Sequence, residues 1–145
     1  MTSKTESVLQ ALATLIDDHT TAKFERNASV PEKIPEGGMV VLRDGNPGAP
    51  DIALGGFSEA LYEHEADIEF YFADGAQASR DAGFDMLVTQ VGTALEADPT
   101  LGGLLIARTN FPYPDVSVEI IPGSDAIKLG TSSLLLEYEA SRSFS

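Results

Sequence analysis

Polar and apolar residues alternate along the segment 61–74, LYEHEADIEFYFAD. A two-residue period is typical of a β-strand with one buried and one exposed face. The segment is longer than the usual five or six residues of a strand, so we expect it to be central in a sheet or to protrude from it. His64, Phe70 and Phe72 share the apolar face. The other face carries an acidic row that consists of Glu63, Glu65, Asp67 and Glu69.

Two other segments have helical spacing. Ser3 and Glu6 form a capping-box pattern in front of apolar residues spaced for a helix, which predicts a helix over about 3–18. A second helix is predicted over about 79–96, and Pro99 followed by two glycines is a typical stop signal. Its apolar stripe consists of Phe84, Leu87, Val88, Val91, Ala94 and Leu95.

Shorter apolar segments predict the remaining strands, and their order predicts the fold class. The predicted strands cover 22–26, 39–44, 104–109, 116–121 and a long segment from 126, and residues 51–54 are expected to pair back onto the strand before them. The order is helix, three or four strands, helix, three strands. It predicts an α+β fold with an antiparallel or mixed sheet, both helices on one face, and the second helix as the crossover.

The chain length of 145 residues suits a single domain, 1–145, with a core of its own. From about residue 139 the pattern fades, which predicts a tail that is mobile or ordered only by a partner. No segment has the apolar run of a signal peptide or the roughly 18 apolar residues of a membrane helix. We therefore expect a soluble protein made in the cytoplasm, with no membrane partner.

The charge balance is strongly acidic, with 9 Lys and Arg against 23 Asp and Glu, a formal net charge of −14. Nucleic-acid-binding proteins concentrate positive charge on one face, so this balance argues against a phosphate-binding surface. It fits a protein that nucleic acid slides past, or one that meets a basic partner. The chain has no cysteine, which excludes disulfides, thiol nucleophiles and Cys-ligated zinc.

The acidic row and the histidines are the first candidates for chemistry. Carboxylates suit calcium or magnesium, but a row along one strand does not converge on one point as cation ligands must. We therefore expect a solvated sheet face rather than a metal site. His64 is expected to be a hydrogen-bonded residue at the edge of the core rather than a general base, because its strand neighbours Glu63 and Glu65 point away from it. His19 is expected to interact with the C-terminal end of the first helix.

The remaining motifs do not complete a site. The stretch DGNPGAPD begins like a calcium loop, but Ala49 and Gly55 occupy the positions where such a loop needs Gly and Glu, so we expect a turn. The glycine pairs of LGGF and LGGL lack the spacing of a phosphate-binding loop, and Gly102 and Gly103 are expected to form a tight turn after the helix. We therefore expect no catalytic residue, no metal and no cofactor.

Five segments in this order resemble the tail terminator (tail completion) proteins of long-tailed bacteriophages, prophages and gene transfer agents. The resemblance runs from Ser3 to about Tyr138, and the order of the segments is more distinctive than any one of them. The segments are KTESVLQALATLI, VPEKIPEGGMVVLRDGNPG, YEHEADIEFYFAD, RDAGFDMLVTQVGTALEADPTLGGL and DAIKLGTSSLLLEYE.

The resemblance implies a structural protein of the virion rather than an enzyme. Tail terminators are small α/β proteins that form a hexameric ring on the head-proximal end of the tail tube. The ring stops tube polymerisation and contacts the tail tube protein and the head-completion (stopper) protein. Genomic DNA passes through its centre without specific binding, and the family has no catalytic motif to carry over.

Ring subunits meet through heterologous contacts, and Pro- and Gly-rich loops are our candidates for them. The acidic row would line either the lumen, where it would repel DNA, or the outside of the ring, and the sequence leaves both open. Two other functions are weighed beside the tail terminator: another phage neck or head–tail connector protein, and a small hydrolase or transferase built around His64. The candidate contact residues are Pro31, Ile34, Pro35, Asn46, Pro47, Pro50, Phe57 and Phe144.

Overall fold

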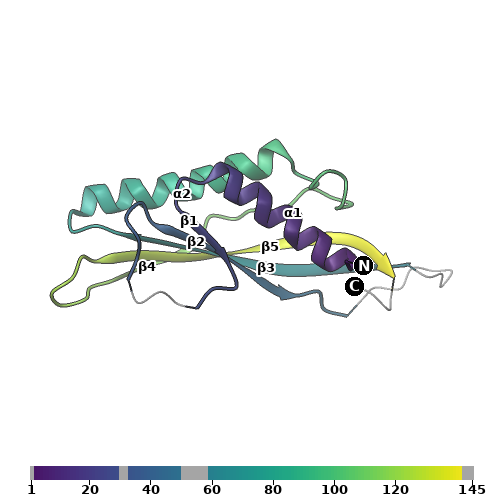
Figure 1. The fold of residues 1–145 in the computed structure, drawn as a ribbon, viewed down its shortest axis with the longest axis horizontal. Helices are drawn as coiled ribbons and strands as arrows, with labels where there is room; N and C mark the ends of the chain where they lie inside the picture. The colour runs from purple at the N-terminus through teal and green to yellow at the C-terminus, as the bar shows by residue number, and fades with distance from the viewer. Residues whose placement is uncertain (1, 30–32, 50–58, 142–145) are drawn as a thin grey trace.

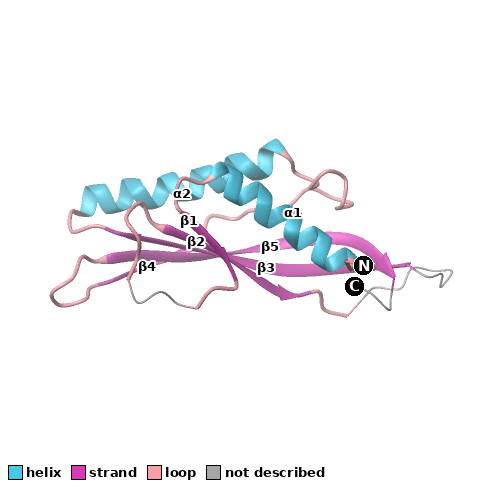
Figure 2. Cartoon of the chain, viewed as in Figure 1, coloured by secondary structure: helices cyan, strands magenta, loops and turns pink. Residues whose placement is uncertain are grey.

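The computed structural model describes residues 2–29, 33–49 and 59–141, in which two helices lie in one layer over a β-sheet (Figures 1 and 2). Both predicted helices and the long predicted strand are present. The elements are α1 (Lys4–His19), β1 (Lys23–Arg26), β2 (Met39–Asn46), β3 (Glu59–Ala73), α2 (Gln77–Ala97), β4 (Asp115–Glu119) and β5 (Ile127–Ser141).

The five strands form one mixed sheet in the order β1-β2-β3-β5-β4. β1 pairs in parallel with β2, and all other pairings are antiparallel. β3 is the central strand, as its length predicts, and pairs with β5 along all of its fifteen residues. The chain passes from β3 through α2 to β4 on the far side of β5, so α2 is the predicted crossover. The predicted α+β fold with both helices on one face of the sheet is confirmed.

α1 begins at the predicted cap, although only half of the capping box forms. The side chain of Ser3 accepts a hydrogen bond of 3.1 Å from the backbone N–H of Glu6. The Glu6 carboxylate does not return to Ser3, because it binds Arg26 in β1. The buried side of the helix, which packs on the core, is formed by Val8, Leu9, Leu12 and Ile16.

α2 contributes the larger share of the helix layer to the core. All six residues of its predicted apolar stripe are buried. Phe84 meets Phe70 of β3 edge to face at 6.1 Å between ring centroids, and Phe111 lies 6.3 Å from Phe70 on another side. Such aromatic pairs add about 0.5–1.5 kcal/mol beyond the burial of their area. They join the helix, the central strand and the loop after α2 in one core.

The predicted strand over 104–109 is wrong. The chain forms turns there, with Leu101 at φ 51° and the N–H of Leu105 bonded to the carbonyl of Thr100. Leu101 and Leu105 are buried in the core, whereas Ile106 is 53% exposed. The apolar run therefore closes the end of the core beneath α2. Its contacts with β5 are a 2.9 Å hydrogen bond from the Ile106 N–H to the Glu137 carbonyl and an isolated bridge at Asn110, which do not form a strand.

Two predicted ends also differ. The predicted turn that starts at Asp44 begins later, because β2 continues to Asn46 through an irregularity at Gly45, whose φ is 63°. A Cβ at Gly45 would meet the carbonyl oxygen of Glu65, so glycine alone fits there. β5 continues to Ser141, so the predicted tail starts later than 139. The predicted pairing of 51–54 lies outside the described residues.

Neither α1 nor α2 combines the length and the apolar character that a membrane-spanning helix requires, and these are the helices of the described residues. α2 is long enough, but its exposed side carries polar and charged residues such as Asp85, Thr89 and Glu96. Its amphipathic pattern matches a helix that packs on a sheet with one side and meets water with the other.

We predict opposite effects for two Gly→Ala changes in α2. Gly92→Ala should stabilise the protein by up to about 1 kcal/mol, because alanine favours a helix and its Cβ would lie 3.7 Å from the Phe111 ring, an ordinary contact. Gly83→Ala should instead destabilise it by about 1 kcal/mol or more, because its Cβ would lie 2.2 Å from the Phe72 ring.

Urea denaturation of both variants provides the measurement, and Phe72→Ala with and without Gly83→Ala provides the control. Without the Phe72 ring, the Gly83 change should no longer be unfavourable. Equal stabilisation by both glycine changes would contradict the close approach of α2 to the sheet.

Candidate functional site

The acidic row lies on the sheet face opposite the helices, which we call the open face. The alternation predicts this placement: Tyr62, His64 and Ala66 of β3 are buried, whereas Glu63 and Glu65 are exposed. The β2 residues Met39 and Val41 also point to this face. No helix covers this face (Figure 2). Its β2 part is nevertheless closed, because Met39 is 3% and Val41 0% exposed, so only the part with Glu63 and Glu65 meets solvent.

The acidic row on the open face consists of two halves with different contacts. Asp67 accepts a hydrogen bond of 2.7 Å from the Ser133 hydroxyl of β5. Glu69 forms an ion pair of 3.2 Å with Arg43 of β2 and accepts a 2.8 Å hydrogen bond from the Tyr71 hydroxyl. Burial and the Glu69 carboxylate raise the pKa of Tyr71 to about 12. Asp67 and Glu69 are thus bound into the sheet, and Glu63 and Glu65 carry the exposed charge.

β5 adds two acids to the exposed half that the sequence reading did not assign. In the strand register, Glu63 lies opposite Glu137 and Leu61 lies opposite Glu139. The alternation in LLLEYEA marks Glu137 and Glu139 as members of one strand face, but only the register shows that they neighbour Glu63. Like charges directly opposite each other destabilise a sheet slightly, so this acidic patch does not serve the stability of the fold.

The buried histidine belongs to a closed hydrogen-bond chain on the helix side of the sheet. His64 is fully buried, with Nε2 against the backbone carbonyl of Asp44 and Nδ1 2.9 Å from the Tyr138 hydroxyl. Because a carbonyl only accepts, Nε2 donates to Asp44, and Nδ1 of a neutral ring accepts from Tyr138. The Tyr138 oxygen in turn lies 2.8 Å from the Thr5 hydroxyl of α1.

This chain uses both ring nitrogens of His64, as the prediction of a hydrogen-bonded core-edge residue requires. Neither nitrogen is free to accept a proton from a bound molecule, so the arrangement does not support a general base. His19 also follows its prediction, because its Nδ1 lies 2.9 Å from the carbonyl of Leu15 in the last turn of α1.

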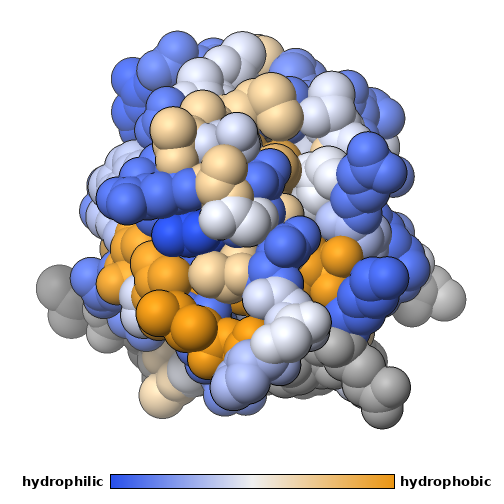
Figure 3. All heavy atoms as spheres, turned by 90° about the vertical axis from the view of Figure 1, so that its left-hand side faces the viewer, coloured by the Kyte–Doolittle hydropathy of each residue, from blue (hydrophilic) through white to orange (hydrophobic). Residues whose placement is uncertain are grey.

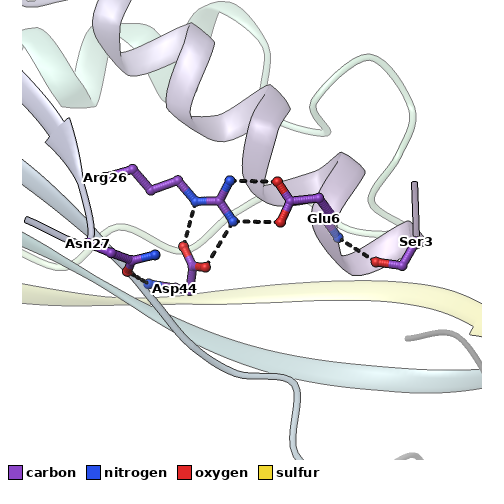
Figure 4. Close-up of polar contacts among 5 residues, drawn as sticks. All are labelled: Ser3, Glu6, Arg26, Asn27 and Asp44. Atoms are coloured by element: carbon purple, nitrogen blue, oxygen red, sulfur yellow. Dashed lines mark hydrogen bonds and ion pairs between the residues drawn. The ribbon is translucent and has the colours of Figure 1, made fainter. Parts of the chain in front are cut away.

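An arginine bridge that the sequence reading did not identify connects α1 to the sheet (Figure 4). The Arg26 guanidinium donates to both carboxylate oxygens of Glu6 in α1 at 2.7 and 2.8 Å. It also donates to both oxygens of Asp44 in β2 at 2.7 and 2.9 Å. Asn27, whose backbone φ is 55°, accepts a 3.0 Å hydrogen bond through its side-chain Oδ1 from the N–H of Asp44 and holds that residue in place.

The bridge favours the charged form of each of its three members. Hydrogen bonds from Arg26 lower the pKa of the Glu6 carboxyl and of the Asp44 carboxyl, and the two carboxylates raise the pKa of Arg26. Asp44 had been considered as the first residue of a calcium loop, and its carboxylate is occupied by the guanidinium instead. The bridge is a structural clamp between helix and sheet rather than an open site.

Within the described ranges, no cluster of three or more His, Asp or Glu side chains could hold a metal ion. The candidate contact residues are spread over different environments. Ile34 is buried, Pro35 and Pro47 are half-buried, and Asn46 is exposed at the end of β2. The others, Pro31, Pro50, Phe57 and Phe144, lie outside the described residues.

One end of the molecule carries exposed hydrophobic side chains. The connection from β4 to β5 lies at this end (Figure 1), and Figure 3 shows hydrophobic surface there in the half below the helices. Ile120 is 84% exposed and Ile121 is 38% exposed. A groove of about 770 Å³ lies between residues 33–36 and this connection, with Ile34, Pro35 and Ile127 among its walls. The surface is suited to contact with another protein.

A scan against models of protein families and a search of curated proteins both find no match for this chain.

We predict that replacing Arg26 by Gln lowers stability in a pH-dependent way. At pH 7 the loss should be about 1–2 kcal/mol, after allowance for partial solvent exposure, because two carboxylates lose their partner. The bridge stabilises the fold at a pH above the ordinary carboxyl pKa of about 4. This stabilisation is lost as the pH falls through the lowered pKa values of the Glu6 and Asp44 carboxyls.

Urea denaturation between pH 7 and pH 2 would show the difference between the two proteins shrinking on the acid side. Arg43→Gln, which removes two longer hydrogen bonds to one oxygen of a single carboxylate, is the matched control and should cost less. A loss for Arg26→Gln that is constant from pH 7 to pH 2 would contradict the ionic character of the bridge.

Proposed function

We propose that this chain is a tail terminator: a structural virion protein whose ring caps the head-proximal end of a phage tail tube. The ring would stop tube polymerisation and join the tail to the head-completion proteins. The resemblance of five segments over most of the chain supports this proposal, and hexamer formation follows from that resemblance.

The observation that carries the proposal is the open face of the sheet, with its exposed acids. Glu63, Glu65 and Glu139 are exposed there, and Glu137 lies opposite Glu63. A surface that lines a DNA channel must leave the DNA mobile, and negative charge does so by repelling phosphates. We therefore assign this face to the lumen of the ring.

The hydrogen bonding of the polar residues also supports a structural role. His64 is engaged at both nitrogens, Asp44 is bound by Arg26, and Glu69 is bound by Arg43. Each of these side chains stabilises the fold and none is presented to a substrate. The proposed partners are further copies of the chain, the tail tube protein and the head-completion protein.

We predict that particles made without this protein contain overlong tail tubes without heads. Electron microscopy of tails from cells that lack the chain would measure the tube length, and expression of the intact chain should restore it. Tubes of normal length in its absence would contradict the proposal. A subunit located in the head connector rather than at the tube end would indicate another neck protein.

We predict that Glu63→Lys together with Glu65→Lys slows the release of DNA from assembled particles, because lysines in the lumen would bind phosphates. The matched control is Asp17→Lys with Asp18→Lys, which makes the same charge change at exposed positions of α1 on the helix side. DNA release triggered in vitro and followed by dye fluorescence is the measurement. An equal effect of both pairs would show that only net charge matters, and no effect of the β3 pair would place the open face outside the lumen.

A further inference from the structure

Both outer strands of the sheet leave one side without a strand partner among the described residues. β1 pairs only with β2, and β4 pairs only with β5. Every residue of β4 is exposed, including Val116 at 40% and Val118 at 46%. Proteins protect such edges with charged side chains, proline, a bulge or a short strand. β4, with the sequence DVSVE, has no lysine, proline or bulge, and its charges are the two acids at its ends. An exposed edge with two valines between two acids is suited to pairing with a strand that offers apolar and basic residues.

We propose that the β4 edge of one subunit pairs with the β1 edge of a second copy of the same chain. The inference rests on the proposed ring, because it names the contact between ring neighbours. A contact between two different edges is heterologous, and repeated heterologous contacts close into a ring when the rotation permits.

The direction of the strands supports this pairing. β4 is antiparallel to β5, and β5 is antiparallel to β3, so β4 runs in the direction of β3. β2 is antiparallel to β3 and β1 is parallel to β2, so β1 runs in the opposite direction to β4. If neighbouring subunits share one orientation, β4 therefore meets the next β1 as an antiparallel pair. The open faces of all subunits then form one continuous surface.

The side chains select one register for this pair. Lys23 and Glu25 of β1 and the odd-numbered residues of β4 point to the open face, because they pair with open-face positions of β2 and β5. In two registers, open-face residues of β1 lie opposite open-face residues of β4 and at least three residues of each strand are paired. One of them places Glu25 opposite Asp115, which is unfavourable because like charges repel.

The other register pairs all four residues of β1 and contains no like-charge pair. It places Lys23 opposite Glu119 and Phe24 opposite Val118, one ionic and one apolar cross-strand pair, each of a favourable type. Lys23 lies 3.3 Å from the Glu25 carboxylate of its own strand, so in this register Glu119 becomes a second acidic neighbour of Lys23. The remaining positions are Glu25 opposite Ser117 and Arg26 opposite Val116.

Charge also distinguishes the two edges along the chain. Residues 23–43, around β1 and β2, carry four bases and three acids, a net charge of 4 − 3 = +1, and Lys23, Arg26 and Arg43 each have an acidic partner within the chain. The segment 109–127, which contains β4, has three acids and no base. A two-fold contact between two β4 strands is less suitable, because the register that pairs all five residues places Asp115 opposite Glu119 at both ends.

A charge-swap series tests the contact and its register. Lys23→Glu and Glu119→Lys should each weaken self-association, by roughly two- to fivefold per contact, because each creates a like-charge pair. The double variant should restore it, because the pair is again of opposite charge. Sedimentation of the isolated chain at increasing concentration is the measurement. If self-association of the Lys23→Glu chain is restored by Asp115→Lys and not by Glu119→Lys, the inference is overturned. It is also overturned if the unchanged chain stays monomeric at every concentration.

Cysteine cross-linking maps the register directly, because the chain has no cysteine of its own. A mixture of the Glu25→Cys and Ser117→Cys chains should form disulfide-linked dimers on oxidation, and the chain with both changes should form a ladder of oligomers. Glu25→Cys mixed with Asp115→Cys is the matched control for the other register. Dimers formed by Ser117→Cys alone would indicate the two-fold contact and overturn the inference.

These experiments separate the contact from the proposed function. A ladder from the Glu25 and Ser117 pair in a protein whose loss leaves tail length unchanged would support the edge contact and refute the tail role. Overlong tails in cells that lack the chain, together with no ladder from the chain with both cysteines, would support the tail role and refute the edge contact.

Discussion

The central strand β3 imposes the constraint on which the rest of the molecule depends. Successive side chains of a strand point to opposite faces, so each residue of β3 belongs either to the helix side or to the open face. Phe70 and His64 are fully buried under the helices, and Glu63 and Glu65 meet solvent on the other side. A shift of the register by one residue would exchange these two sets, so the core and the acidic surface depend on the same pairing of β3 with β5.

The helix layer is held on this sheet by two kinds of contact. Phe84 of α2 inserts its ring against Phe70 of β3, and this contact is apolar. α1 is attached in addition through polar groups, with Arg26 between Glu6 and Asp44 and with Thr5 near the Tyr138 hydroxyl. These polar groups bind one another, so they contribute to the orientation of α1 rather than to an open site.

The same architecture leaves the part of the open face around Glu63 and Glu65, and two edges of the sheet, exposed. The helices cover one side only, and α2 packs on β3 and β5, while β4 beyond them keeps its side chains exposed. A ring subunit needs a surface toward the channel and two different surfaces toward its neighbours. The open face and the β1 and β4 edges match these needs in number and in charge, and this is the physical basis of the proposal that the chain forms a tail-terminating ring.

The sequence by itself determined both helices, the long strand β3 and the face of each of their residues, because helical and strand periods are local properties of the chain. The stripe of α2 and the buried side of β3 follow from spacing alone. Only the tertiary structure decided which segments become neighbours, as with Glu137 beside Glu63 and Arg26 between two carboxylates distant in sequence. It also decided that the apolar run 104–109 closes the core instead of forming a strand. Such outcomes depend on long-range pairing and on the space left at the end of the core, and a local pattern contains information on neither.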